Sequence, residues 1–292
     1  MTTAHSSEAV EVLVLRLQAP LMSFGGVAVD EIRPTREMPG RSLLTGLLGN
    51  ALGWHHRDSE ALQRLQQRLV YAVRQDDPGQ YLEDFHTVDL GQSFLSRGWT
   101  TRGAPEGRGS GSATSGTHIR QLHYLADAAY TVALTLSPAE EQPTLEALHA
   151  ALARPARPRF LGRKTCLPSR PLVGHRGECD RLTAASPLEA LTRIPQWHQS
   201  ASQPAQREPA GGNRGEDRQV WWPGAPAGAA PSRDEIAAVG ALGVRFDRSL
   251  PVTDERDWHH QFHAGRRFLN EGSLPWPPAV AKADTKEGGA DG

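Results

Sequence analysis

A short apolar strand, a glycine-containing turn, an arginine cluster and a glycine-spaced apolar helix follow one another within residues 13–53. The apolar run Glu11–Leu17 predicts a buried strand. From Ser42 onward leucines recur at three- and four-residue spacing, which predicts a helix with Ser42 as its N-cap. Three glycines in this helix each lower its stability by roughly 1 kcal/mol relative to alanine. We therefore expect another backbone or helix to approach closely at Gly46, Gly49 and Gly53.

The arginines that precede this helix form a candidate anion site. Arg33, Arg36 and Arg41 lie just before its expected N-terminus. Free amide N–H groups and the helix dipole attract anions at that end, and arginine binds phosphate through paired hydrogen bonds. The cluster predicts phosphate binding, with Ser42 and the helix amides completing the cradle and a polynucleotide supplying several phosphates at once. A solvated turn with ordinary surface arginines is the alternative that the pattern leaves open.

Charge is distributed unevenly along the 292-residue chain, whose net charge is −1. Residues 1–90 hold 8 basic and 12 acidic side chains, residues 91–176 hold 11 and 5, and residues 177–292 hold 13 and 16. The middle third is therefore the part that can attract phosphate despite the neutral whole. Arginine outnumbers lysine 29 to 3, so coding bias is an alternative source of this pattern.

Composition excludes several classes of protein. No apolar run is long enough to span a bilayer, and residues 1–10 lack the pattern of a secretory signal. Two cysteines, Cys166 and Cys179, do not make a disulfide framework. We expect a cytoplasmic protein without a membrane partner.

Five spaced blocks of sequence resemble the CasD family, the CRISPR-associated family-five subunit of the subtype I-E Cascade complex. They occur in the family's order: LRLQAPLMSFGG at 15–26, RPTREMPGRSLLTGLLGNALG at 33–53, DFHTV at 84–88, YTVAL at 130–134 and FLGRKTC at 160–166.

The likeness extends loosely to about Arg176 and returns faintly near 247–267. Glu37 departs from the family, which often has a basic residue there. The resemblance implies a non-catalytic subunit that binds and caps the five-prime handle of the CRISPR RNA without a cofactor or metal. It also implies contacts with the neighbouring backbone subunit, with the large subunit and with target DNA in the assembled complex.

The order of expected elements predicts an α+β fold. A helix over 58–69, a strand over 70–73, a strand over 129–136 and a helix over 143–152 follow the first strand and helix. This order fits a split βαβ, ferredoxin-like domain. The resemblance likewise implies a ferredoxin-like, RNA-recognition-like (RAMP) core with a protruding β-hairpin thumb and a small C-terminal β-rich segment.

The expected domain boundaries follow from this pattern and from composition. They are a disordered N-terminus at 1–9, the core domain at 10–195 with a thumb insertion at about 91–125, a linker or long loop at 196–240, a C-terminal β segment at 241–276 and a disordered tail at 277–292. Residues 98–116 are rich in Gly and Ser, and we expect them to be too flexible to hold structure alone. Trp221 and Trp222 interrupt the linker, so we expect part of it to dock, with the large subunit as one candidate.

Two further regions carry candidate RNA contacts. The bases of the thumb offer His86, Arg97 and Arg120, and the basic turn after the helix expected at 143–152 offers Arg163 and Lys164. A flexible surface loop and a charged edge strand are the respective alternatives. The full predicted RNA-binding set is Ser23, Phe24, Gly25, Arg33, Pro34, Thr35, Arg36, Arg41, Ser42, Gly46, His86, Arg97, Arg120, Arg163 and Lys164.

The sequence also offers two enzymatic alternatives to binding. His259 and His263 are four residues apart, a spacing that places two metal ligands on one face of a helix, but no HExxH or CxxC motif accompanies them. A metal-independent ribonuclease that processes repeat RNA would need a tyrosine, lysine and histidine set, for which the chain offers His86, Tyr81 or Tyr124, and Lys164. The resemblance implies that another subunit does the cutting, so we predict no catalytic residue.

Overall fold

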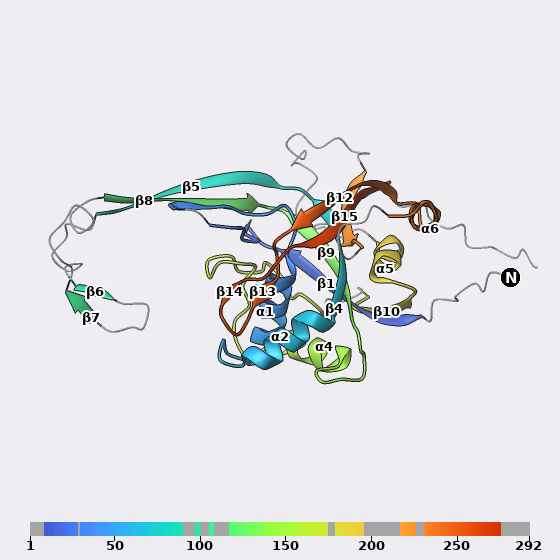
Figure 1. Ribbon diagram of the computed structural model, residues 1–292, viewed down its shortest axis with the longest axis horizontal. Helices are drawn as coiled ribbons and strands as arrows, with labels where there is room; N and C mark the ends of the chain where they lie inside the picture. The colour runs from blue at the N-terminus through green and yellow to red at the C-terminus, as the bar shows by residue number, and fades with distance from the viewer. Residues whose placement is uncertain are drawn as a thin grey trace, which may run out of the picture.

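The computed structural model describes residues 9–28, 30–89, 97–99, 105–107, 117–174, 179–195, 217–225 and 231–275. A large antiparallel sheet forms the body, and a second, four-stranded sheet contributes a long hairpin arm that extends away from it (Figure 1). The mixed α/β structure that the sequence predicted is confirmed. No helix in these ranges is long and apolar enough to cross a membrane.

The strands are β1 (Val10–Gln18), β2 (Leu21–Met22), β3 (Ile32–Arg33), β4 (Leu69–Asp77), β5 (Gln80–Asp89), β6 (Arg97–Trp99), β7 (Pro105–Gly107), β8 (Thr117–Ala126), β9 (Ala129–Leu136), β10 (Arg181–Ala184), β11 (Arg218–Pro223), β12 (Arg245–Val252), β13 (Arg256–Asp257), β14 (Phe262–His263) and β15 (Arg267–Leu274). The helices are α1 (Arg41–Ala51), α2 (Ser59–Arg68), α4 (Leu145–Ala153), α5 (Pro187–Arg193) and α6 (Arg233–Ala241).

The main sheet has seven strands in the order β10-β1-β9-β4-β11-β15-β12, and every neighbouring pair is antiparallel. The first four strands of this order come from the first two thirds of the chain. Helices α1 and α2 connect β1 to β4, and α4 lies between β9 and β10 in sequence. The last three strands come from the C-terminal third and continue the same sheet beyond β4.

Side chains alternate between the two faces of the main sheet. Leu13, Leu15 and Leu17 of β1 join one buried cluster with residues of α1, α2 and α4. Val12 joins a second cluster that contains Leu188 and other residues of α5. Because successive strand residues point to opposite faces, the apolar run of β1 is explained by burial on both sides.

A neighbour approaches closely at Gly49 and Gly53, as the sequence predicted, whereas the contact at Gly46 is an ordinary one. A Cβ on Gly49 would lie 2.6 Å from Leu62 Cδ2 of α2. A Cβ on Gly46 would lie 3.6 Å from the Trp258 ring, and Gly53 adopts φ +87° just after the helix. Leu62 of α2 therefore occupies the space that a side chain at Gly49 would need.

The β5–β8 arm is an antiparallel ladder in which Gln80–Asp89 pair with 117–126 along their full length. Figure 1 shows the arm leaving the body, with the short pair β6–β7 at its far end. Its first strand begins at Gln80, earlier than the thumb boundary of about 91 that the sequence suggested. The glycine-rich stretch 98–116 also contains paired backbone at 98–99 and 105–107, and its remaining residues lie outside the described ranges.

The expected linker at 196–240 contains regular structure. Residues 217–225 hold β11 and residues 231–240 hold most of α6, whereas 196–216 and 226–230 lie outside the described ranges. Strand β11 is anchored in the core, because Trp221 is buried in the first cluster and Trp222 in the second. The disorder expected at 1–9 and 277–292 falls outside the described ranges except at residue 9.

Candidate nucleic-acid interface

A groove of about 570 Å³ runs along α1. One face of this helix forms its floor, through Ser42, Leu43, Gly46, Leu47 and Asn50. This spacing corresponds to a single helical face about 12 Å long. We call this feature the α1 groove.

The first wall of the α1 groove consists of the turn after β2 and the loop after α4. Arg33 and Arg163 line it from these two segments. Arg163 is held in place because its Nη1 donates to His123 O (2.7 Å) and its Nη2 to Arg33 O (2.7 Å). Its Cζ also lies 4.5 Å from the centre of the Tyr124 ring, a cation–π contact.

Arg157 lines the same wall beside the C-terminal end of α1. Its Nη1 donates to Trp54 O (2.8 Å), and its Nη2 lies 2.7 Å from His55 Nε2. These bonds tie Arg157 to the backbone just after α1, where its charge also complements the helix dipole.

The second wall comes from α2 and from the C-terminal third of the chain, through His56, Leu62, Arg256 and Trp258. Counting both walls, four arginines and two histidines line the α1 groove, whereas no aspartate or glutamate of the described residues does. The groove therefore concentrates positive charge in a chain whose net charge is −1.

The N-terminus of α1 differs from the phosphate cradle that we expected. Its N-cap is Gly40, not Ser42, and no side chain caps it in the usual way. The amide of Arg41 donates to Asp254 Oδ2 (2.9 Å) and that of Ser42 to Asp254 O (2.8 Å). The buried carboxylate of Asp254 thus occupies the anion position, and the predicted use of these amides for phosphate is wrong.

Asp254 is itself held by two further side chains. Arg267 donates to both of its carboxylate oxygens (2.7 and 2.6 Å), and the Tyr71 hydroxyl lies 3.2 Å from Oδ2. Burial disfavours the charged form of Asp254, but the hydrogen bonds and the charge of Arg267 outweigh it, so the pKa of Asp254 is lowered. Burial raises the pKa of the Tyr71 hydroxyl, which stays protonated.

Two of the three clustered arginines contact the same C-terminal loop. Arg36 Nη2 donates to Thr253 O (2.6 Å), and Arg41 forms an ion pair with Glu255. Arg33 instead lines the α1 groove, where its Nη1 donates to backbone carbonyls of Asp30 and Ile32. Within the cluster, Arg33 is the residue best placed to meet a ligand in the groove.

The α1 groove brings together eight of the predicted RNA-binding residues, namely Ser23, Phe24, Gly25, Arg33, Pro34, Ser42, Gly46 and Arg163. Thr35 helps to fix the backbone of Phe24, because its Oγ1 accepts a hydrogen bond from the Phe24 amide (2.9 Å). Lys164 is exposed beside Arg163 and is not part of the lining.

The remaining predicted residues lie on the β5–β8 arm. His86 and Arg120 face each other across the ladder, and the His86 ring pairs with Asp84 on its own strand. The backbone of Arg97 belongs to β6, and its side chain lies outside the described part of the structure. The arm also exposes large apolar side chains at Tyr81 (60%) and Phe85 (57%).

The predicted set omits most of the other residues that line the groove, among them His55, His56, Arg157, Arg256 and Trp258. The sequence does point to Arg157, because it belongs to the basic run before Arg163. No sequence pattern points to Arg256 or Trp258, because only the packing of β13 against α2 brings them to α1.

The histidine pair considered for metal binding does not lie on a helix. Residues 258–261 form a turn between β13 and β14, and His263 pairs with Arg256 across that hairpin. His259 Nδ1 instead lies 3.2 Å from Ser59 Oγ. Within the described ranges no group of three or more His, Cys, Asp or Glu side chains is arranged to hold a metal.

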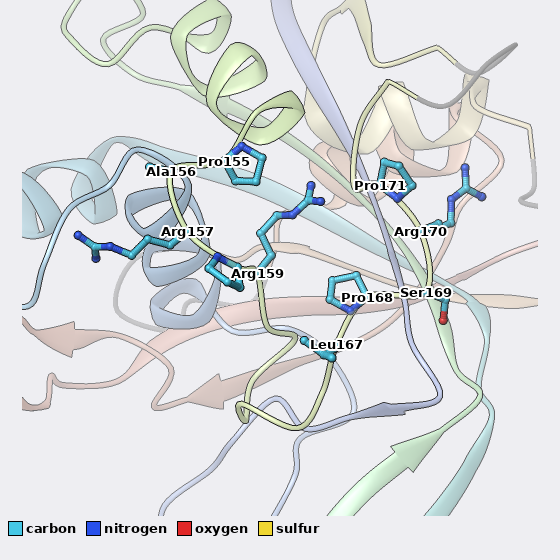
Figure 2. Close-up of a pocket in the computed structure, with 10 residues that line it drawn as sticks. Pro155, Ala156, Arg157, Arg159, Leu167, Pro168, Ser169, Arg170 and Pro171 are labelled. Carbon is cyan, nitrogen blue, oxygen red and sulfur yellow. The ribbon is translucent and has the colours of Figure 1, made fainter.

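A second hollow of about 620 Å³ lies on the other side of the loop after α4, between Pro155–Arg159 and Leu167–Pro171 (Figure 2). Figure 2 shows Arg159 reaching toward the space between these segments, whereas Arg157 and Arg170 point away from it. Arg159 Nη1 donates to Leu152 O (2.9 Å), which ties it to the end of α4. Proline side chains form much of the remaining lining, so the α1 groove is the stronger candidate for a polyanion.

Comparison with known proteins gives a consistent family assignment. The family described as CRISPR-associated protein (Cas_Cas5) matches residues 12–260. The CRISPR system Cascade subunit CasD of Escherichia coli (strain K12) is 36% identical over 187 residues, which cover 61% of this chain and 75% of that protein.

Two solved structures share the fold. A chain of a CRISPR RNA-guided surveillance complex aligns with a TM-score of 0.55 at 23% identity, covering 91% of this chain and 92% of its own. A crystal structure of a Cas protein aligns with a TM-score of 0.50 at 25% identity, covering 90% and 95%. Because the matched family spans most of the chain, this protein belongs to the CRISPR-associated protein (Cas_Cas5) family.

Proposed function

We propose that this chain is a non-catalytic subunit of a type I-E CRISPR Cascade surveillance complex. In this proposal it binds and caps the five-prime handle of the CRISPR RNA in antiviral defence and acts in the cytoplasm. Its further partners are the adjacent backbone subunit, the large subunit and, in the assembled complex, target DNA. The 36% identity to the Cascade subunit CasD of Escherichia coli supports the assignment to such a complex.

The observation that carries RNA binding is the α1 groove. Arg33, Arg157, Arg163 and Arg256 line it without any acidic side chain among the described residues. A concave site with cations along its length suits the phosphates of a single strand, because each neutralised phosphate releases counterions. The floor has no side chain at Gly46, which leaves room for a sugar–phosphate backbone to lie close to α1 at that point.

The arrangement of β1, β4, β9 and β10 supports a ferredoxin-like, RAMP-type core. In chain order these strands are first, second, third and fourth, with helices after the first and third. Their spatial order β10-β1-β9-β4 places the first strand between the fourth and the third. This is the split βαβ arrangement, with α1, α2 and α4 packed on one face.

The two faces of the β5–β8 arm support its proposed role as the thumb. Phe85 and Tyr81 point to one face, because they are separated by an even number of residues. His86 and its cross-strand partner Arg120 lie on the other face. The exposed aromatic side chains on the first face suit contact with a protein partner, and Arg120, which shares the second face with Asp84 and Val88, suits contact with RNA.

The positions of the histidine and tyrosines support a non-catalytic role. His86 and Tyr81 are on opposite faces of β5, and Tyr124 lies opposite Leu82, four residues along the strand from His86. Four strand residues correspond to about 13 Å, too far for direct proton transfer between the two side chains. Tyr124 is also buried beneath Arg163.

Charge reversal at Arg33 tests the binding function. The variant Arg33→Glu, co-expressed with the other Cascade subunits and a CRISPR array, is expected to retain less guide RNA per complex, and progressively less as salt rises. Arg233→Glu on the exposed face of α6 is the control and should retain the wild-type amount. Equal guide content in both variants would contradict the proposed groove.

A cleavage assay separates binding from processing. Labelled RNA of the cognate CRISPR repeat, incubated with the purified chain with and without chelator, should remain intact while shifting in a binding assay. Specific cleavage that His86→Ala abolishes would establish the ribonuclease instead.

A further inference from the structure

The second wall of the α1 groove comes from a segment far away in sequence. Residues 253–258 follow β12 and return to α1 and α2. We propose that Arg256 is an RNA-phosphate contact that faces the first-wall arginines across α1, so that the strand is gripped from both sides. This inference rests on the proposed function and adds a residue that the sequence motifs do not contain.

The backbone around Arg256 is fixed by α2. Gln66 Nε2 donates to Arg256 O (2.8 Å), and Gln66 Oε1 accepts from the Arg256 amide (3.1 Å) and from Trp258 Nε1 (3.0 Å). The Trp258 amide donates to Gln63 Oε1 (3.1 Å). These bonds give the segment a single position on α2, so Arg256 is presented in a preorganised way.

Asp254 fixes the same segment to α1. Its carboxylate and carbonyl accept from the first two amides of the helix, as described above. Asp254 is therefore a positioning residue, because it holds the segment that carries Arg256 without lining the groove itself.

The Arg256 side chain retains hydrogen-bonding capacity. Its Nη2 donates to Gln261 Oε1 (2.7 Å), and its Cζ lies 5.4 Å from the Trp258 ring centre. Its Nε is buried and donates to none of the described residues. Ser23 Oγ, in the lining of the first wall, is likewise buried without such a partner. Buried polar atoms without partners are rare in folded proteins, and two of them border this groove.

Cations on both sides of a groove favour a polyanion more than cations on one side. A single RNA strand that lies on α1 would place its phosphates between Arg256 and the arginines of the first wall. Each contact adds to the salt dependence of binding, with a slope of about 0.7 per phosphate for single strands. A surface arginine outside the groove makes no such contribution.

The test is RNA binding by the full-length chain across a salt series. Fluorescence anisotropy measures binding of labelled single-stranded handle RNA. We expect Arg256→Gln to bind about fivefold more weakly than the wild type, because this is the loss in affinity that removing one partly exposed charge contact causes. The salt slope should fall by about 0.7, whereas Arg256→Lys should keep the wild-type slope. Arg266→Gln, exposed in the same C-terminal segment, is the matched control and should match the wild type.

The outcomes distinguish this inference from the proposed function. If Arg256→Gln leaves the salt slope unchanged while Arg33→Glu weakens binding, Arg256 does not contact the RNA. The proposed function would still hold. Failure of the wild-type chain to bind handle RNA would overturn the function itself. If Arg256→Gln does not fold, cross-linking of thiouridine-labelled RNA to the wild-type chain decides the matter. A cross-linked peptide containing Arg256 supports the inference, and its absence beside cross-links to the first wall refutes it.

Discussion

Several long-range contacts converge on Asp254. Its side chain is 1% exposed and links the first turn of α1, Tyr71 of β4 and Arg267 of β15. These elements are brought together by the fold from separate parts of the chain. A buried carboxylate is tolerated only when charge and hydrogen bonds compensate its lost hydration, and here Arg267 and the amides provide both.

Neutralising Asp254 should destabilise the protein strongly. Asp254→Asn leaves Arg267 buried without its counter-charge, so the free energy of unfolding is expected to fall by about 3 kcal/mol. Denaturant unfolding at pH 7 measures this change. Asp30→Asn is the matched control, because Asp30 is exposed and asparagine also adopts its positive φ, and it should change the free energy by no more than about 0.5 kcal/mol.

The pH dependence of this effect follows from the lowered pKa of Asp254. A carboxyl with a lower pKa in the folded state than in the unfolded state stabilises the protein at pH values above its ordinary value. That contribution is lost as the pH falls below about 4 and through the folded-state pKa. The difference in unfolding free energy between wild type and Asp254→Asn should therefore shrink in that range. A constant difference would contradict the assignment of the charge to Asp254.

At the scale of elements, local pattern predicted much of the structure. Residues 129–136 form a strand with the expected bounds, and the helix expected at 58–69 is α2. The errors arise where distant residues decide local structure. Asp254 replaces Ser42 as the partner of the α1 amides, and Trp221 and Trp222 order a strand within a composition typical of a linker. Neither effect is visible in a short sequence window.

In the candidate site, too, neighbours in sequence were predicted together, whereas residues brought in from far along the chain were not. Residues that follow one another before and within α1 were predicted to act together, and most of them line one groove. The second wall was not predictable, because nothing in the sequence around Arg256 and Trp258 indicates contact with residues about two hundred positions earlier.

The loop that carries Arg163 depends on a glycine. Gly162 has φ +106°, and a Cβ there would lie 1.6 Å from Ser23 O. The adjacent Leu161 O accepts from the Ser23 amide (3.1 Å), so the loop and the turn after β2 are in backbone contact. This close approach places Arg163 next to Arg33 in the first wall.

Gly162→Ala should therefore separate the two segments of the first wall. We expect a loss of at least about 3 kcal/mol in unfolding free energy, because strain at positive φ adds to a backbone clash. Gly174→Ala is the matched control, since Gly174 also has positive φ (+77°) but no atom of a non-neighbouring residue that the structure describes lies within 4 Å of its Cβ position. It should cost only about 1–2 kcal/mol. Thermal or denaturant unfolding measures both, and equal losses would show that the contact with Ser23 is unimportant.

At the scale of the whole molecule, the C-terminal third is part of the same sheet as the N-terminal core. β11 pairs with β4 through Val220 and Trp221, and β15 and β12 follow outward. Trp221 and Leu269 are buried in the same cluster as Leu13 and Leu15 of β1. A continuous sheet with a shared core gives the C-terminal strands no independent hydrophobic core of their own.

This continuity predicts one cooperative unit of unfolding. Native-state hydrogen exchange should give amides of β9 and β15 similar free energies of opening, because neither strand can open globally without the other. Trp221→Ala removes a large side chain from the shared cluster and should lower both values together, by about 3–5 kcal/mol. Ile236→Ala on α6, a helix without a buried residue, should lower neither. If β15 exchanged through an opening several kcal/mol lower in free energy than β9, the C-terminal strands would be a separate unit. The second wall of the groove would then be able to detach from α1 while the core stays folded.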